Sequence, residues 1–220
     1  MKKWLWLTAH SDSHRAMYER HFLPSFNKYL AQHCELQTRV LPYYAGSFGE
    51  DAFNEMGRES AGYTANILRQ SIGRHIVVSG CDLRFYRDFM ADIEDALQHA
   101  ELVGMNDIYG PICGELLAFV CSERIVALYD WIVANDRQFG NEQWTLNAGI
   151  RALSINAAMM PDTFWTVGMQ GTGVWKQGDP VHPPEDISLH HANFAIGAQD
   201  KMALLYAVFA SVTADTTASA

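Results

Sequence analysis

Short apolar runs alternate with amphipathic segments through the first 150 residues. Residues 4–8 and 75–79 are runs typical of buried strands, and residues 36–41 alternate like a strand as far as Pro42. The segments between them carry apolar residues at helical spacing. The expected helices cover residues 14–30, 63–72, 85–100, 123–134 and 140–153, and further strands cover residues 101–104 and 113–121. This alternation predicts an α/β sheet with helices on both faces.

The pattern changes after Met160, where glycine and proline recur from Gly168 to Pro184. This composition predicts a long, mostly irregular segment, and loops of that length in a compact domain usually carry function. Residues 45–57 are rich in glycine, acidic residues and phenylalanine, and they also predict a loop. A final short helix is expected over residues 200–209.

The chain is expected to form one domain over residues 1–210, followed by a disordered tail over residues 211–220. Sixteen Lys and Arg against 25 Asp and Glu give a formal net charge of −9. This charge disfavours nucleic acid and anionic membranes as partners, because both need a basic face. We expect no integral membrane segment, since no run approaches the roughly 20 apolar residues that a span requires.

The four cysteines are widely spaced and form no CxxC pair. They are Cys34, Cys81, Cys113 and Cys121. Such spacing favours free thiols in a reducing compartment, although it leaves one or two disulfide bridges open. The apolar run near the N-terminus is shorter than the core of a signal peptide. The sequence therefore predicts a cytoplasmic location.

One acidic residue stands at a position typical of ligand sites. Asp82 follows the buried strand 75–79, and open α/β sheets bind ligands at the carboxyl ends of their strands. A carboxylate there can hold a divalent cation. It can equally cap the turn into the next element.

Two further segments carry polar side chains that could take part in binding or catalysis. Glu142 and Gln143 begin a predicted helix, where they could bind sugar hydroxyls, act as an acid/base pair or sit at the positive helix end. His190 and His191 are adjacent in an extended segment, so a single site would recruit only one of them. His10 and His14 share no metal-binding motif, and we interpret them as structural.

Taken in order, these pieces resemble the nucleotide-diphospho-sugar transferase family, glycosyltransferases of the GT-A type. Members carry a strand ending in DxD, a Cys-x-Gly segment, an Asn-Asp-Gln before a helix, and a late His-x-Asn followed by Gly and Lys. The counterparts are Ser79–Phe85, Cys113–Gly114, Asn141–Gln143 with Asn147, and His191–Phe194 with Gly197 and Lys201. Two departures stand out: Gly80 occupies the position of the first DxD aspartate, and Glu142 replaces the aspartate of Asn-Asp-Gln.

The resemblance implies a mixed sheet flanked by helices, with a Rossmann-like N-terminal half. It implies transfer of a sugar from a nucleotide-diphosphate-sugar donor to an acceptor hydroxyl. Asp82 and His191 would bind Mn²⁺ or Mg²⁺, and Glu142 and Gln143 would be catalytic. The substrate-binding residues would be Gly80, Asp82, Asn147, Asn193, Gly197 and Lys201. Residues 165–175 would belong to a mobile loop on the acceptor side. The alternative is a non-catalytic nucleotide-sugar-binding relative that lost the carboxylate at Gly80, which Gly80→Asp would restore.

Overall fold

A computed structural model describes residues 3–42, 51–108, 110–135, 138–139, 141–171 and 173–218. The strands are β1 (Trp4–His10), β2 (Cys34–Val40), β3 (His75–Ser79), β4 (Leu83–Phe85), β5 (Leu102–Asp107), β6 (Gly110–Val120), β7 (Ala157–Met159), β8 (Phe164–Thr166) and β9 (Leu189–His191). The helices are α1 (Arg15–Met17), α2 (Leu23–Tyr29), α3 (Asp51–Leu68), α4 (Met90–Ala96), α5 (Glu123–Asn135), α6 (Glu142–Ala152) and α7 (Gly197–Ala218). A π-helical turn, Tyr18–Phe22, joins α1 to α2.

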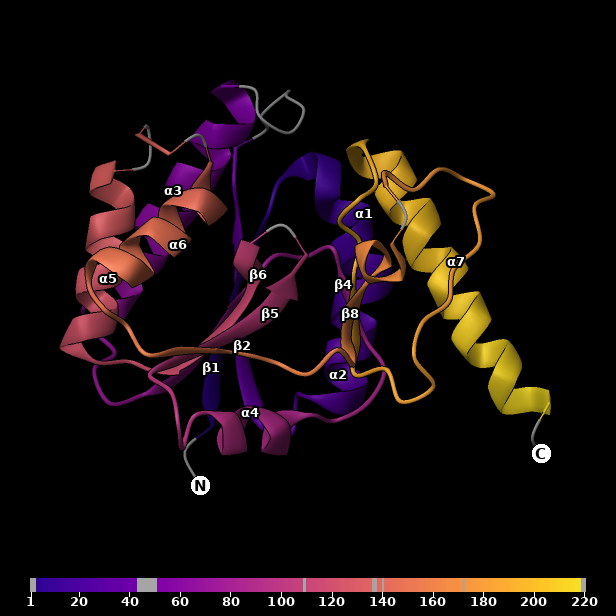
Figure 1. Cartoon of the computed structure of the whole chain (residues 1–220), viewed down its shortest axis with the longest axis horizontal. Helices are drawn as coiled ribbons and strands as arrows, with labels where there is room; N and C mark the ends of the chain where they lie inside the picture. The colour runs from indigo at the N-terminus through magenta and orange to yellow at the C-terminus, as the bar shows by residue number, and fades with distance from the viewer. Residues whose placement is uncertain are drawn as a thin grey trace.

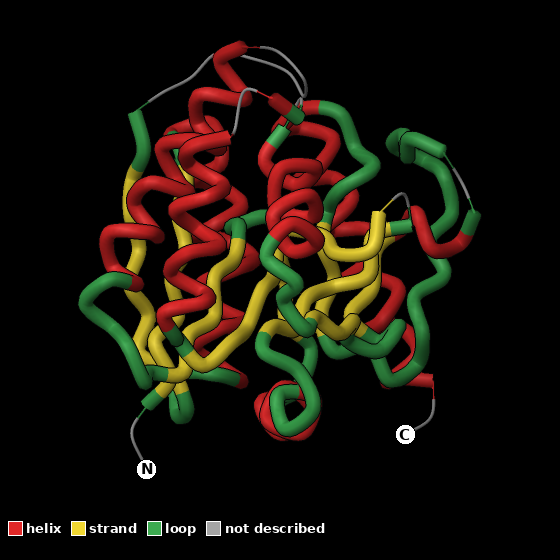
Figure 2. Tube along the Cα trace, turned by 60° about the vertical axis from the view of Figure 1, so that its left-hand side comes forward, coloured by secondary structure: helices red, strands yellow, loops and turns green. Residues whose placement is uncertain are grey.

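The strands form two sheets. The large sheet has the order β2-β1-β3-β6-β5-β7, and the small sheet has the order β4-β9-β8. In the large sheet β1 is parallel to both β2 and β3, as in a Rossmann-like half, whereas β6 is antiparallel to β3 and β5. Helices lie on both sides of the strands (Figures 1 and 2). The predicted α/β class, with a mixed sheet flanked by helices, is therefore confirmed.

Successive side chains of β1 belong to two different apolar layers, one on each face of the large sheet. Trp4 and Trp6 pack with the buried side chains of α2, β4 and α4, whereas Leu5 and Leu7 pack with those of α3, α5 and α6. Figure 1 shows these last three helices together over one face of the large sheet. Side chains of β1 point alternately to the two faces, so both faces can be buried. A third apolar cluster lies beneath α7.

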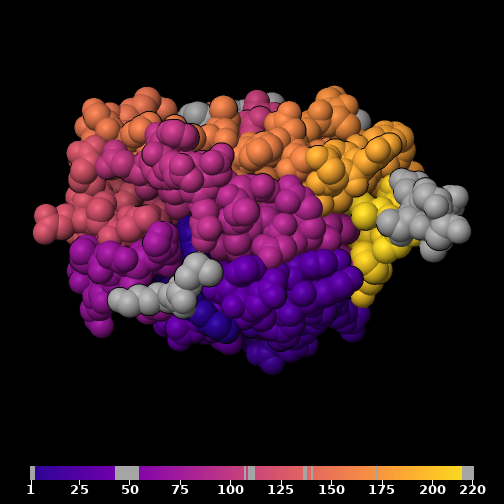
Figure 3. Space-filling model, turned by 90° about the horizontal axis from the view of Figure 1, so that it is seen from below, coloured from indigo at the N-terminus to yellow at the C-terminus, as the bar shows by residue number. Residues whose placement is uncertain are grey.

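Segments distant in sequence also meet on the surface. Figure 3 shows the chain near residues 20–40 lying against the chain near residues 85–105. There His33 Nε2 lies 2.6 Å from Asp88 Oδ2, and Gln32 Nε2 donates to the same oxygen at 3.2 Å. These contacts tie the turn between α2 and β2 to the segment just before α4.

The predicted helix over residues 85–100 is wrong at its start. Leu83–Phe85 is a strand, because it pairs with β9, and α4 begins only at Met90. Asp88 Oδ1 accepts the Met90 N–H at 3.0 Å, which favours the start of the helix at that point. The pairing of β4 with a strand a hundred residues later overrides the local helical pattern.

Three other predicted boundaries change. Helix α3 begins at Asp51, so residues 51–57 are helical rather than a loop, while residues 45–50 of that predicted loop lie outside the described residues. The final helix begins at Gly197 and continues to Ala218, past its expected end at Phe209. Residues 211–218, expected to be disordered, are thus helical, and 219–220 lie outside the described residues. The segment after Met160 contains β8, β9 and a 3₁₀ turn.

All four cysteines are buried free thiols. None of the helices within the described ranges combines the length and the hydropathy needed to cross a membrane.

The close contact of α5 and α6 predicts opposite effects of one substitution at two helical glycines. A Cβ at Gly149 would lie 2.8 Å from the Trp131 ring and 2.9 Å from Leu128, whereas a Cβ at Gly62 would meet nothing within 4 Å. Gly149→Ala should therefore lower the free energy of unfolding by about 1–3 kcal/mol. Gly62→Ala should raise it by about 0.5–1 kcal/mol, because alanine favours helix. Urea unfolding measures both, and equal effects would contradict this packing of α5 on α6.

Candidate functional site

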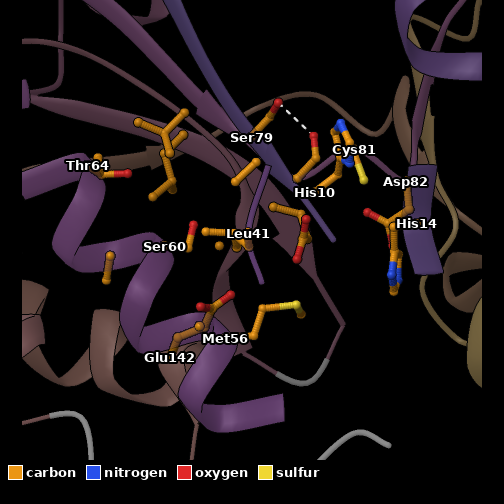
Figure 4. Close-up of a pocket in the computed structure, with 18 of the residues that line it drawn as sticks. His10, His14, Leu41, Met56, Ser60, Thr64, Ser79, Cys81, Asp82 and Glu142 are labelled. Carbon is orange, nitrogen blue, oxygen red and sulfur yellow. Dashed lines mark hydrogen bonds between the residues drawn. The ribbon is translucent and has the colours of Figure 1, made fainter. Parts of the chain in front are cut away.

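A cavity lies at the edge of the large sheet where β1 and β3 end. It has a volume of about 160 Å³. Because β1 and β3 are parallel, their carboxyl ends meet at this edge, where open α/β sheets bind ligands. Figure 4 shows Asp82 and His14 on one side of the cavity and Met56 and Glu142 on another. The cavity therefore joins the end of β3 to helices α3 and α6.

Asp82 is placed where the chain crosses from the large sheet to the small one. The Gly80 N–H donates to the Glu115 carbonyl at 3.1 Å, which continues the pairing of β3 with β6. Two residues later the Asp82 carbonyl accepts the Ala192 N–H at 3.0 Å, beside the pairing of β4 with β9. Thr8 Oγ1 also donates to the Gly80 carbonyl, at 3.1 Å. Both sheets thus hold the backbone around Asp82.

This crossing brings side chains from three distant segments together. Lys201 Nζ, from α7, donates to Asp82 Oδ2 at 2.6 Å. His191 Nε2, from β9, lies 3.6 Å from the same oxygen, and Cys113 Sγ lies 3.8 Å from His191 Nδ1. Asp82 is only 4% exposed and His191 only 3%. Their convergence is the spatial condition that the predicted cation site requires.

The charges in this cluster hold one another in the ionised form. Burial alone would raise the pKa of Asp82, but the charges of Lys201 and His191 keep it well below its usual range. Burial alone would lower the pKa of His191, yet Asp82 raises it well above the usual value. The pKa of Lys201 is also raised, because the charges of Asp82 and Glu115 outweigh its burial. Asp82 is therefore a carboxylate between two cations.

A second carboxyl group, Glu115, lies in the same cluster. Its side chain hydrogen-bonds to Asp82, and burial together with the charge of Asp82 raises its pKa. One ligand atom each of Asp82, Glu115 and His191 lies within 4.8 Å of the others. Once Glu115 and His191 have released their protons, two carboxylates and one imidazole form a donor set that suits Mg²⁺ or Mn²⁺. The chemistry of the residues thus fits the cation that the resemblance implies.

Sequence reasoning did not single out Glu115. The available signal was an acidic residue inside the apolar run of β6. Nothing in the local pattern says that this acid faces a second one, because that depends on the pairing of β6 with β3.

The two adjacent histidines point in opposite directions, as the extended backbone predicts. His191 faces Asp82, whereas His190 packs against Trp165 with a distance of 5.3 Å between ring centroids. Both His190 ring nitrogens are buried without a hydrogen-bond partner. Burial, reinforced by the charge of His191, lowers the pKa of His190 to about 3, so this imidazole is neutral. Only His191 belongs to the site.

Of the predicted residues on α6, Glu142 alone lines the cavity. Gln143 is not among the lining residues. Asn147 is buried, and its Nδ2 donates to the Ile112 carbonyl at 2.8 Å and to the Gln143 carbonyl at 2.9 Å. Asn147 therefore ties α6 to β6 instead of facing the cavity.

Two predicted substrate-binding residues near β9 also lie outside the cavity lining. Thr166 Oγ1 donates to Asn193 Oδ1, which ties the end of β8 to the segment after β9. Gly197 begins α7 with a φ of +78°, a conformation that favours glycine. Asn193 and Gly197 therefore help to fix the backbone between β9 and Lys201.

The structure places two histidines and two tryptophans differently from expectation. His10 and His14, interpreted as structural, both line the cavity, and burial lowers the pKa of His14. Trp165 and Trp175, expected to bound a mobile acceptor-side loop, are 4% and 2% exposed and belong to the apolar cluster beneath α7. The two indoles are therefore core residues.

Comparisons with known proteins show which solved structures share this fold. No family model and no curated protein matches the sequence. The structure is similar to that of a glycosyltransferase involved in glycosylation of the major capsid of PBCV-1, with a TM-score of 0.63 and 8% identity over 93% of this chain and 100% of that one.

It is also similar to the glycosyltransferase GlyE of Streptococcus pneumoniae TIGR4. The TM-score is 0.61 at 11% identity over 94% of this chain and 60% of that one. For the apo form it is 0.54 at 12% identity over 78% of this chain and 48% of that one. The chain therefore spans about half of the GlyE chains. It has the fold of these glycosyltransferases.

The charge cluster predicts a specific loss of stability at alkaline pH. A raised pKa of His191 means that its contribution is complete below the unfolded pKa near 6.5 and is lost as pH rises through the folded pKa. We expect the free energy of unfolding, measured with a chelator present, to fall as the pH rises above about 7. Loss of the single His191 proton accounts for a slope of up to about 1.4 kcal/mol per pH unit. Asp82→Asn should remove that slope. Urea unfolding at several pH values measures the difference, and parallel profiles would contradict the Asp82–His191 pair.

Proposed function

We propose that the chain transfers a sugar from a nucleotide-diphosphate-sugar donor to an acceptor hydroxyl. The observation that carries this proposal is the buried cluster of Asp82, His191 and Lys201 beside a cavity at the carboxyl edge of the sheet. The fold shared with known glycosyltransferases supports it.

The proposed reaction requires positive charge beside the diphosphate of the donor. Transfer breaks the bond between the anomeric carbon and a phosphate oxygen and forms a bond to the acceptor oxygen, whose proton is released. Negative charge develops on the leaving diphosphate. Lys201 Nζ, which donates a hydrogen bond to Asp82 in this structure, would offset part of that charge. Asp82 and His191 would hold Mn²⁺ or Mg²⁺, which supplies Lewis-acid stabilisation of the diphosphate oxygens when bound.

In this proposal Glu142 would face the sugar. It lines the cavity away from Asp82, at the start of α6 (Figure 4). Its carboxylate lies so close to Gly57 of α3 that a Cβ there would overlap it, so the glycine makes room for the acid. We propose Glu142 as the acid/base or hydroxyl-binding group, and we leave Gln143 out because it does not line the cavity.

The alternative function is binding of a nucleotide sugar without turnover. The short Lys201–Asp82 ion pair favours it, because Lys201 already neutralises the carboxylate that would bind the cation. The discriminating measurement is hydrolysis of a panel of nucleotide sugars with and without Mn²⁺. Turnover that depends on Mn²⁺ supports the transferase, whereas tight binding with no turnover against a broad acceptor panel supports the binding protein.

The role of Asp82 is tested by Asp82→Asn. We expect this variant to lose Mn²⁺-dependent affinity for UDP by at least about tenfold, or about 1.4 kcal/mol, because the amide carries no charge for the cation. Isothermal titration calorimetry with and without Mn²⁺ measures the change. Asp186→Asn, at an exposed aspartate in the segment before β9, is the matched control and should bind like the wild type. Equal UDP affinity in Asp82→Asn and the wild type would refute the assignment.

A further inference from the structure

We propose that Glu115 supplies the cation-binding carboxylate that the segment 79–82 lacks at Gly80. The proposal rests on the proposed function, because it concerns the cation site formed by Asp82 and His191. It assigns a third ligand on a different strand, β6.

The backbone makes positions 80 and 115 neighbours. Ser79 pairs with Leu116 in the antiparallel ladder of β3 and β6, and the Gly80 N–H donates to the Glu115 carbonyl one step further on. Residues opposite each other in such a ladder project side chains to the same face of the sheet. A side chain on either residue therefore reaches the same place.

The Glu115 carboxylate occupies the space that a side chain at position 80 would fill. A Cβ built on Gly80 would overlap Glu115 Oε2, and it would lie 2.9 Å from Glu115 Cδ and 3.1 Å from Asp82 Oδ1. Gly80 has no positive φ that would require a glycine. The absence of a side chain at position 80 thus leaves room for the carboxylate from β6, directly beside Asp82.

A packing role alone does not account for Glu115. Its neighbours along the strand, Leu116 and Leu117, are buried in the two apolar layers, whereas its own side chain turns to a second carboxylate. Two carboxyl groups in contact need a proton or a cation between them. Lys201 donates to Asp82, and one ligand atom each of Asp82, Glu115 and His191 lies within 4.8 Å of the other two. Ligand atoms this close together can bind one divalent cation.

The proposal changes what Gly80→Asp should do. If the position were simply missing a ligand, the new aspartate would tighten cation binding. Because Glu115 fills the space, Gly80→Asp instead crowds three carboxylates together. The same aspartate should restore binding only after Glu115 has been shortened.

The test is a four-member cycle of the full chain: wild type, Gly80→Asp, Glu115→Ala and the double variant. Electron paramagnetic resonance of free Mn²⁺ measures the affinity for the metal alone, without nucleotide. We expect Glu115→Ala to bind Mn²⁺ at least about tenfold more weakly than the wild type, and the double variant to recover most of that loss. Gly80→Asp should bind no more tightly than the wild type. Glu185→Ala, at an exposed glutamate, should match the wild type.

Thermal unfolding in the presence of a chelator gives a second readout that requires no metal. Gly80→Asp should lower the melting temperature, or fail to fold, and Glu115→Ala should correct this defect in the double variant. Wild-type affinity in Glu115→Ala, or a double variant as weak as Glu115→Ala, would overturn the inference while leaving the proposed transfer reaction standing. A wild type that does not bind Mn²⁺ would overturn both the inference and the metal-assisted form of the proposed function.

Discussion

The site depends on a buried aspartate whose charge must be matched where two sheets meet. Asp82 sits on a stretch of backbone that leaves the large sheet at Gly80 and enters the small sheet at Leu83. An unpaired carboxylate at this depth would cost several kcal/mol. Lys201 and His191 supply the matching charge, so the positions of α7 and β9 are coupled to the end of β3. The small sheet therefore contributes, through His191, part of the positive charge that balances Asp82 at the cavity.

Local pattern predicts most of the large sheet, because its strands are short apolar runs between amphipathic helices. It fails where long-range pairing decides the structure. Leu83–Phe85 continues smoothly into a helical pattern, and only its partner β9 makes it a strand. Residues 51–57 contain a glycine and acidic residues typical of loops, yet they begin α3, where Gly57 packs against Glu142. In both places the deciding contact lies far away in the sequence.

The site is predicted in part for a related reason. The order of motifs along the chain points to Asp82, His191 and Lys201, and these do converge. The same order points to Asn147 and Asn193, whose amides instead bond to groups that hold helices and strands in place. An amide serves a backbone carbonyl as readily as a sugar hydroxyl, so residue type alone cannot separate the two uses. Glu115 belongs to no motif, since its importance arises from the neighbouring strand.

The order in which these groups are synthesised has a consequence for the nascent chain. Every strand of the large sheet lies before residue 160, whereas the imidazole and the ammonium that face Asp82 come from residues 191 and 201. A chain emerging from the ribosome therefore holds both acids before either cation exists. The pairing of Asp82 with His191 and Lys201 can therefore form only after these C-terminal segments have been made.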